Sequence, residues 1–167
     1  MTADLARVDA TRSRSAPVQQ AGAVVVGWAR FSDLPALARL QRRGFTHHHG
    51  YGLLTLASLW LAPRVLILVA RAGNVPAGMI IADERRGRTA HGRILNICVD
   101  PRYRRLGIAR DLMLTAEALL PPRRMVLMVD QKNDAAIALY TSLGYRDVGL
   151  TPDYYGPHRH GVMMQKG

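Results

Sequence analysis

Residues 99–110 read Val99-Asp-Pro-Arg-Tyr-Arg-Arg-Leu-Gly-Ile-Ala-Arg110, and they place a strand end, a short turn and a helix start in direct succession. A helix N-terminus carries unpaired N–H groups and a partial positive charge, so it binds phosphate without a dedicated side chain. Gly107 lets the backbone approach a ligand closely, and Ala109 keeps the next turn unobstructed. The turn therefore predicts a phosphate-bearing ligand, although neither the Walker nor the Rossmann glycine pattern is present. The arginines expected to neutralise its phosphates are Arg102, Arg104, Arg105 and Arg110.

On both sides of this turn, short β-branched runs alternate with helical segments, which predicts a mixed α/β fold. Ser32 is expected to cap the first helix, Gly73-Asn74 to form a hairpin turn, and Pro121-Pro122 to stop the third helix. The expected strands cover residues 24–29, 65–70, 77–83, 93–99, 125–129, 145–150 and 161–164, and the expected helices cover residues 33–44, 53–61, 106–120 and 134–143.

The length of 167 residues and the 49% hydrophobic content fit one ordinary globular domain. The apolar runs are far shorter than the roughly 20 residues of a membrane-spanning helix, so we expect no membrane partner. A single cysteine, Cys98, excludes an internal disulfide framework and favours a cytoplasmic location. Residues 1–21 are polar and lack periodicity, so we expect a disordered basic N-terminal tail without a secretory signal, followed by one domain over residues 22–167.

Charge is unevenly distributed along the chain. Its 23 Lys and Arg residues against 12 Asp and Glu give a net charge of +11. Eight of the arginines lie between Arg85 and Arg110, where Asp100 is the one acidic residue. This concentration indicates an anionic partner close to the phosphate-binding turn. Direct nucleic-acid binding is not favoured, because Tyr103 is the one aromatic residue interleaved with these arginines.

Two motifs resemble the GNAT superfamily of acetyl-CoA-dependent N-acetyltransferases. The first is Arg104-x-x-Gly107-x-Ala109, preceded by Asn96-Ile-Cys-Val-Asp-Pro101. The second is Asn133-x-x-Ala136-x-x-Leu139-Tyr140-x-x-Leu143-Gly144-Tyr145. The ending 151–164 further resembles ribosomal-protein alanine acetyltransferases and N-terminal acetyltransferases. The resemblance implies an α/β GNAT-type fold, with a mixed, mostly antiparallel sheet of six to seven strands, about four flanking helices, and acetyl-CoA in a V-shaped opening between two central strands.

The resemblance also implies roles for individual residues. Backbone groups of Ile97, Cys98 and Val99 would pair with the pantetheine arm of acetyl-CoA, and Asn133 would contact the same arm. The phenol of Tyr140, near the sulfur, would protonate the departing thiolate as the catalytic acid. Without the motif, a core aromatic residue on an amphipathic helix would be the favoured interpretation of Tyr140. The pyrophosphate would be held by the turn residues Arg104, Arg105, Leu106, Gly107, Ile108, Ala109 and Arg110.

One position departs from the ribosomal-protein relatives, whose strand before the asparagine motif carries a glutamate proposed as general base. Here that position is Met128, and Asp130 follows two residues later on the same strand face. An α-amino group with a pKa of about 7.7 to 8.0 is roughly 10% neutral at pH 7, whereas a lysine with a pKa of about 10.4 is neutral in fewer than about one molecule per thousand. A site without a strong base therefore favours an α-amine of a peptide or protein over a lysine side chain.

The acceptor side of such a site is expected to include His49, Tyr51, Tyr154 and Tyr155. The tract His47-His48-His49 is not a metal site in this interpretation, because three consecutive residues on a regular element cannot face one ion and no cysteine or acidic cluster accompanies them. Two alternatives stay open. One is an enzyme acting on a small-molecule amine, and the other is an acetyl-CoA-binding sensor with weakened catalysis.

Overall fold

The computed structural model describes residues 19–21, 24–45, 50–88, 90–120 and 124–167. Within this part of the chain, eight strands form one sheet in the order β1-β2-β3-β4-β5-β6-β8-β7. The strands are β1 Gln19–Ala21, β2 Val24–Trp28, β3 Val65–Ala72, β4 Val75–Arg85, β5 His91–Val99, β6 Met125–Asp130, β7 Arg146–Thr151 and β8 Gly161–Lys166. The helices are α1 Leu34–Gly44, α2 Leu53–Leu61, α3 Ile108–Leu119 and α4 Asp134–Ser142.

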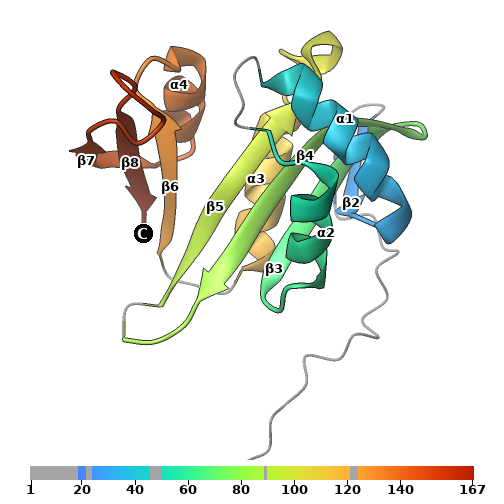
Figure 1. The fold of residues 1–167 in the computed structure, drawn as a ribbon, viewed down its shortest axis with the longest axis horizontal. Helices are drawn as coiled ribbons and strands as arrows, with labels where there is room; N and C mark the ends of the chain where they lie inside the picture. The colour runs from blue at the N-terminus through green and yellow to red at the C-terminus, as the bar shows by residue number, and fades with distance from the viewer. Residues whose placement is uncertain (1–18, 22–23, 46–49, 89, 121–123) are drawn as a thin grey trace, which may run out of the picture.

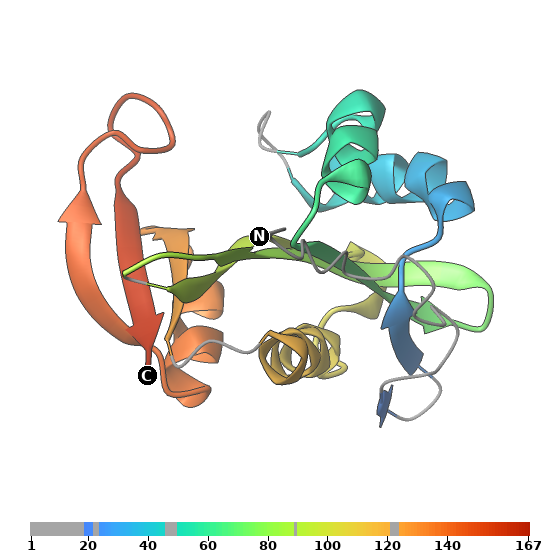
Figure 2. The ribbon, with the colours of Figure 1, turned by 90° about the horizontal axis from the view of Figure 1, so that it is seen from below.

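The sheet separates two helical layers (Figures 1 and 2). Helices α1 and α2 cover one face, and α3 and α4 lie on the other. Each face buries its own apolar cluster: one joins Leu37, Leu56 and Met79, and the other joins Ile80, Leu112 and Tyr140. The loop between β7 and β8 rises on the face that α1 and α2 cover. The space between this loop and the two helices is therefore reached from that face.

The α/β class, the mostly antiparallel sheet and the four flanking helices are confirmed. The sheet has one strand more than expected, because β1 pairs antiparallel with β2 as an added edge strand. Residues 19–21 were assigned to the disordered tail, and this boundary is wrong for those three residues. Residues 1–18, 46–49 and 121–123 lie outside the described part of the chain. The predictions for most of the tail, for the histidine tract and for Pro121-Pro122 concern these residues.

Two helix starts differ from the sequence prediction. A short 3₁₀ turn, Phe31–Asp33, precedes α1, so Asp33 rather than Ser32 occupies the N-cap position. Helix α3 begins at Ile108 instead of Leu106, because Gly107 has φ +78° and this left-handed conformation cannot belong to an α-helix. The predicted hairpin turn at Gly73-Asn74 is confirmed between β3 and β4.

Candidate functional site

A deep cleft opens between β5 and β6, the one parallel strand pair of the described sheet. The two strands pair only from Gly92 to Ile94 and from Met125 to Leu127, and beyond these residues they diverge (Figure 1). The resulting cleft has a volume of about 1630 Å³. It is lined by β5 and β6, by residues at both ends of the segment that joins α1 to α2, by the start of α4 and by the β7–β8 loop. The V-shaped opening expected from the sequence is thus present.

A β-bulge lies in β5 where the divergence begins. Asn96 pairs with Ile81 and Ile94 pairs with Ala82, so Leu95 has no partner of its own on β4. Such an extra residue bends a strand and increases its local twist. After the bulge, the edge of β5 that faces away from β4 has no strand beside it, and its backbone groups from Ile97 to Val99 are open to the cleft. This open edge fits the amide-containing arm that the resemblance implied.

The N-terminus of α3 stands at the wide end of the cleft. Gly107 is its N-cap residue, no side chain caps the helix, and the first helical hydrogen bond runs from the Asp111 amide to the Gly107 carbonyl. The amides of residues 108–110 therefore have no helical acceptor, and they concentrate positive potential there. Arg105, with φ +64°, is also left-handed. Left-handed residues within such a turn can direct successive backbone N–H groups toward a common anion, and here Arg105 and Gly107 flank Leu106.

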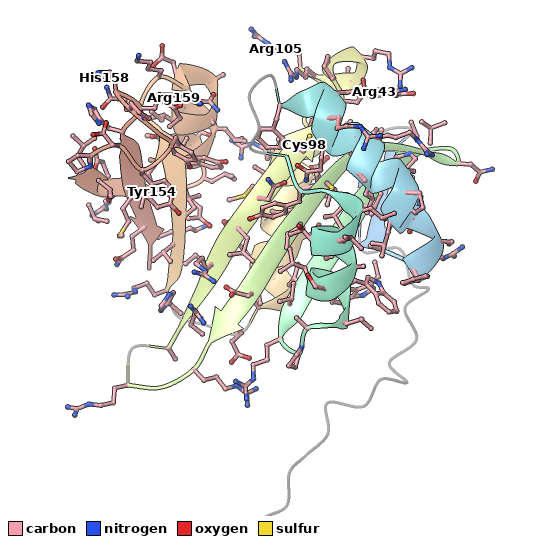
Figure 3. The ribbon with its side chains drawn as sticks, viewed as in Figure 1. Arg43, Cys98, Arg105, Tyr154, His158 and Arg159 are labelled. Carbon is pink, nitrogen blue, oxygen red and sulfur yellow. The ribbon has the colours of Figure 1, made fainter. Side chains whose placement is uncertain are left out.

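The arginines of the turn lie around this helix end. Arg104 lines the cleft and donates from Nη2 to the Gly44 carbonyl at 3.3 Å. Arg110 donates to Ser142 Oγ at 2.9 Å, whereas Arg105 and Leu106 are exposed (Figure 3). The side chain of Ile108 is buried in the core, so only its backbone faces the turn. Arg105, Leu106, Gly107, Ile108 and Arg110 thus surround the helix end without lining the cleft itself.

Asp100 anchors the turn to the sheet. Its amide donates to the Ala77 carbonyl, and its carboxylate accepts from the Arg102 amide and from the Arg102 guanidinium at 2.9 to 3.0 Å. The hydrogen bond from the Arg102 side chain is the main reason that the pKa of Asp100 falls to about 2. Arg102 therefore fixes the turn through Asp100 and is not free to contact a phosphate with the same donors.

Tyr140 lies on α4 with 5% of its surface exposed, and it lines the cleft. Burial raises the pKa of Tyr140 to about 12, so the phenol keeps its proton at neutral pH. The structure gives its hydroxyl no hydrogen-bond partner among the described residues. A protonated donor at the wall of the cleft matches the acid that the sequence predicted. Asn133 also lines the cleft, and its Oδ1 caps α4 by accepting from the Ala136 amide at 3.2 Å.

The side chain of Cys98 points away from the open edge of β5, beneath α1 (Figure 3). Its Sγ donates to the Leu40 carbonyl at 3.6 Å, and burial raises the pKa of the thiol to about 12. A thiol with this pKa stays protonated and is a poor nucleophile. The side chain of Cys98 therefore offers no nucleophile to the cleft.

The carboxylate nearest the expected base position is already paired. Asp130 accepts from the Lys132 amide at 3.0 Å and from Arg159 Nε at 3.0 Å. Burial by itself raises the pKa of Asp130, but these hydrogen bonds outweigh it and hold the pKa below its usual range. The group is therefore a weak base. Arg159 pairs with this strand-end aspartate, which is therefore not a freely solvated carboxylate.

Tyr51, Tyr154 and Tyr155 line the cleft on the face that α1 and α2 cover, and we call them the acceptor wall after the role that the sequence analysis expects of them. Tyr51 and Tyr154 line the cleft, and burial is the main cause of the raised pKa of Tyr51. Tyr155 packs edge-on against Tyr154 with ring centroids 4.9 Å apart, and its hydroxyl donates to the Met128 carbonyl at 2.9 Å. The structure thus brings together three of the four predicted acceptor residues, and His49 lies outside the described residues.

Sequence reasoning missed three polar residues at this wall: Gln41, Arg93 and Asn96. Arg93 lines the cleft and donates to Asp83 at 2.7 and 3.1 Å. The sequence does contain a sign of the unusual position of Gln41. This residue follows Leu34 by seven positions and Leu37 by four, a spacing that puts a polar side chain on the apolar face of α1. No group of three His, Cys, Asp or Glu side chains within the described residues is placed to hold a metal ion.

Comparison with known proteins decides the family. A model described as "Acetyltransferase (GNAT) family" matches residues 34–145, which include the bulge, the turn and α4. The chain belongs to the GNAT family of acetyltransferases. The acetyl donor of this family is acetyl-CoA. The divergent strands, the uncapped α3 N-terminus and the open edge of β5 fit such a donor, because they offer a channel, an anion site and amide partners to one long ligand.

Several GNAT relatives are known by name. The [ribosomal protein bS18]-alanine N-acetyltransferase of Escherichia coli K12 is 30% identical over 130 residues, covering 74% of this chain and 82% of the relative. The mycothiol acetyltransferase of Thermobispora bispora is 32% identical over 126 residues, covering 68% of this chain. The present chain spans only 43% of the length of that relative.

Solved structures share the GNAT fold. The crystal structure of the Escherichia coli ribosomal-protein-S18-alanine N-acetyltransferase superposes with a TM-score of 0.69 at 25% identity, covering 86% of this chain and 92% of that chain. Arabidopsis thaliana Naa50, in complex with the bisubstrate analogue CoA-Ac-MVNAL, gives a TM-score of 0.74 at 19% identity, covering 87% and 99%. Among the described residues, no helix is both long and apolar enough to cross a bilayer.

We expect Gly107→Val to weaken acetyl-CoA binding at least roughly tenfold, because a β-branched residue resists the left-handed conformation that the N-cap adopts. Isothermal titration calorimetry with acetyl-CoA measures the change. Gly73→Val is the matched control, since Gly73 has φ +59° in the β3–β4 turn, away from the cleft. The control should lose stability and keep its affinity. Equal affinity in Gly107→Val and the wild type would contradict the assignment of this turn.

The lowered pKa of Asp100 predicts that the free energy of unfolding falls in a defined range of acid pH. Its folded pKa of about 2 lies below the roughly 3.9 of an unfolded aspartate, so the ionised group stabilises the fold above about pH 4, and that contribution is lost as the pH falls toward 2. We expect Asp100→Asn to flatten the fall in the urea midpoint between pH 4 and 2 and to reduce stability at pH 7. A wild-type slope in the variant would show that Asp100 is not the group responsible.

Proposed function

We propose that this chain transfers the acetyl group of acetyl-CoA to an α-amino group of a peptide or protein, by direct attack of the amine in a ternary complex. The observation that carries the acceptor class is the lack of a free carboxylate base in the described cleft wall. Met128 stands at the position of the relatives' glutamate, and Asp130 is held by Arg159. The expected cytoplasmic location belongs to the same proposal, and the lone buried thiol of Cys98 supports it.

Different groups of the chain would bind different parts of the donor. The amides at the start of α3 would hold the pyrophosphate, with Arg104 beside them, and the open edge of β5 would align the pantetheine arm. When bound, acetyl-CoA supplies the activated acetyl thioester. Tyr140 is placed on α4 at the cleft wall, where its protonated phenol can deliver a proton to the leaving sulfur.

The missing base restricts the amine that can react. Attack requires a neutral nitrogen, and the pKa gap of about 2.5 units between an α-amine and a lysine corresponds to about 3 kcal/mol. Asp130 cannot offset this gap, because its pKa is lowered and its oxygens are hydrogen-bonded. An amine that is already partly neutral at pH 7 therefore suits this cleft.

Charge at the cleft disfavours a polycationic acceptor. Its lining residues include Arg93, Arg104, Lys132 and Arg159, against Asp130 as the one carboxylate among them. A polyamine or aminoglycoside would meet repulsion rather than an acidic pocket. A small-molecule amine without several charges stays as the second candidate, because mycothiol acetyltransferases are among the relatives.

An acceptor panel tests the proposal. We expect a peptide with a free N-terminal alanine to give a kcat/KM at least roughly tenfold higher than an N-terminally blocked peptide with one lysine, because the α-amine is the more neutral of the two at pH 7. Release of CoA thiol from acetyl-CoA measures turnover. Lysine turnover as fast as alanine turnover would contradict the acceptor class, and the absence of acceptor-dependent release with any amine would favour the sensor interpretation.

Tyr140→Phe tests the proton donor. We expect kcat to fall by about 100-fold, within the 10²–10⁴ range of general acid catalysis, while the Kd for acetyl-CoA changes less than about threefold. Tyr103→Phe is the control, since the structure gives that hydroxyl no hydrogen bond among the described residues and Tyr103 does not line the cleft. Full turnover in Tyr140→Phe across the pH range would remove Tyr140 from the mechanism.

A further inference from the structure

Gln41 is a polar residue in an apolar setting. It has no exposed surface, and it lies on the face of α1 that also buries Leu34, Leu37 and Leu40. An unpaired buried amide is costly, so the hydrogen bonds of Gln41 indicate its role. Two of them lead to residues that line the cleft, Tyr51 and Asn96.

The partners of Gln41 fix the orientation of its amide. The backbone N–H of Tyr51 donates to Gln41 Oε1 at 3.4 Å, and a backbone N–H can only donate. The amide nitrogen of Gln41 therefore faces the other way. It donates to Asn96 Oδ1 at 2.6 Å and contacts the sulfur of Met79 at 3.3 Å. Tyr51, Gln41 and Asn96 thus form a directed chain of hydrogen bonds from the acceptor wall to β5.

This chain also fixes Asn96. Because Asn96 Oδ1 accepts from Gln41, the Nδ2 group occupies the opposite end of the side-chain amide. The structure gives Nδ2 no acceptor among the described residues, and Nδ2 is not among their buried unsatisfied atoms. Asn96 lines the cleft at the bulge of β5, where β5 has just left β6. An oriented N–H donor is therefore accessible where the cleft begins to open.

Gln41 holds the surrounding acceptor wall as well. Its carbonyl accepts from the Phe45 amide at 3.1 Å. A Cβ on Gly50 would lie 3.1 Å from the same carbonyl oxygen, so the returning chain packs tightly against Gln41. Phe45, Gly50 and Tyr51 all line the cleft. The side chain of Gln41 thus contacts both the Tyr51 amide and Asn96, while its backbone carbonyl holds Phe45.

We infer that Asn96 Nδ2 donates a hydrogen bond to the first carbonyl oxygen of the acceptor, and that Gln41 is the positioning residue that aims it. The inference rests on the proposed function. An α-amine of a peptide carries a carbonyl carbon two bonds from its nitrogen, whereas the ε-amine of lysine has no acceptor at that distance. Asn96 therefore adds a geometric criterion for an α-amine to the one that the amine pKa supplies.

The experiment compares two acceptors that differ in one atom. One is a peptide with N-terminal alanine, and the other is the same peptide with the first carbonyl oxygen replaced by sulfur, a weaker hydrogen-bond acceptor. We expect the wild type to prefer the oxygen peptide by roughly fivefold in kcat/KM, as the loss of one neutral hydrogen bond predicts. In Asn96→Ala and in Asn96→Leu, which is closer in volume, this preference should fall to about one.

Gln41→Met should reduce the same preference, because it keeps the side-chain volume and removes the group that orients Asn96. Gln165→Met is the matched control, since Gln165 on β8 donates to the Gly167 carbonyl and does not line the cleft. The control should keep the wild-type ratio. A purely structural role of Gln41 would lower stability and turnover with both peptides equally, and it would leave the ratio unchanged.

The outcomes separate this inference from the proposed function. Turnover of both peptides with no preference in the wild type, or an unchanged preference in Asn96→Ala, overturns the inference alone. A rise confined to the KM for acetyl-CoA in Asn96→Ala overturns it too, because Asn96 would then contact the donor. No turnover of the oxygen peptide by the wild type overturns the proposed function, and the inference with it.

Discussion

The separation of β5 from β6 is the constraint on which the rest of the site depends. Pairing between the two strands ends at Ile94 and Leu127, and beyond that point the edge of β5 that faces β6 has no strand partner among the described residues. A sheet normally satisfies these edge groups with another strand. In this cleft the unpaired edge groups of β5 are available to a ligand. The bulge at Leu95 helps to produce the divergence, since an extra residue in one strand bends it away from its neighbours.

The open edge is useful because the wide end of the cleft carries an anion site. Helix α3 is the crossover connection between β5 and β6, so its N-terminus necessarily stands where β5 ends. Gly107 ends the turn in a left-handed conformation and leaves three amides uncapped. Asp100 holds this turn against β4 through the Ala77 carbonyl, so the rigid sheet, and not a flexible loop, sets the distance between anion site and strand edge.

The chemistry at the acceptor end of the cleft depends on which groups the cleft wall lacks. Met128 stands where the resemblance implies a carboxylate base, and the nearby Asp130 accepts hydrogen bonds from Arg159. Three tyrosines with raised pKa values, Tyr51, Tyr140 and Tyr155, keep their protons at neutral pH. Such a wall can donate hydrogen bonds and protons, but it has little capacity to take a proton from the acceptor amine. The GNAT fold thus supports an acceptor that needs little deprotonation, and the directed chain through Gln41 is consistent with an acceptor that carries a carbonyl.

The sequence by itself determined the elements and the family, because strand and helix periodicity, Gly107 and the Asn133 to Tyr145 motif are local properties of the chain. It also pointed to Tyr140 and Asn133, which belong to that motif, and to strand residues 97–99, which belong to the segment from Asn96 to Pro101. Only the tertiary structure decided which polar groups are already used. Asp130 accepts a hydrogen bond from Arg159, which lies 29 positions away, and Asn96 is oriented by Gln41, which lies 55 positions away. Such pairings depend on which strands and helices pack together, and residue spacing carries no record of contacts between segments so distant in sequence.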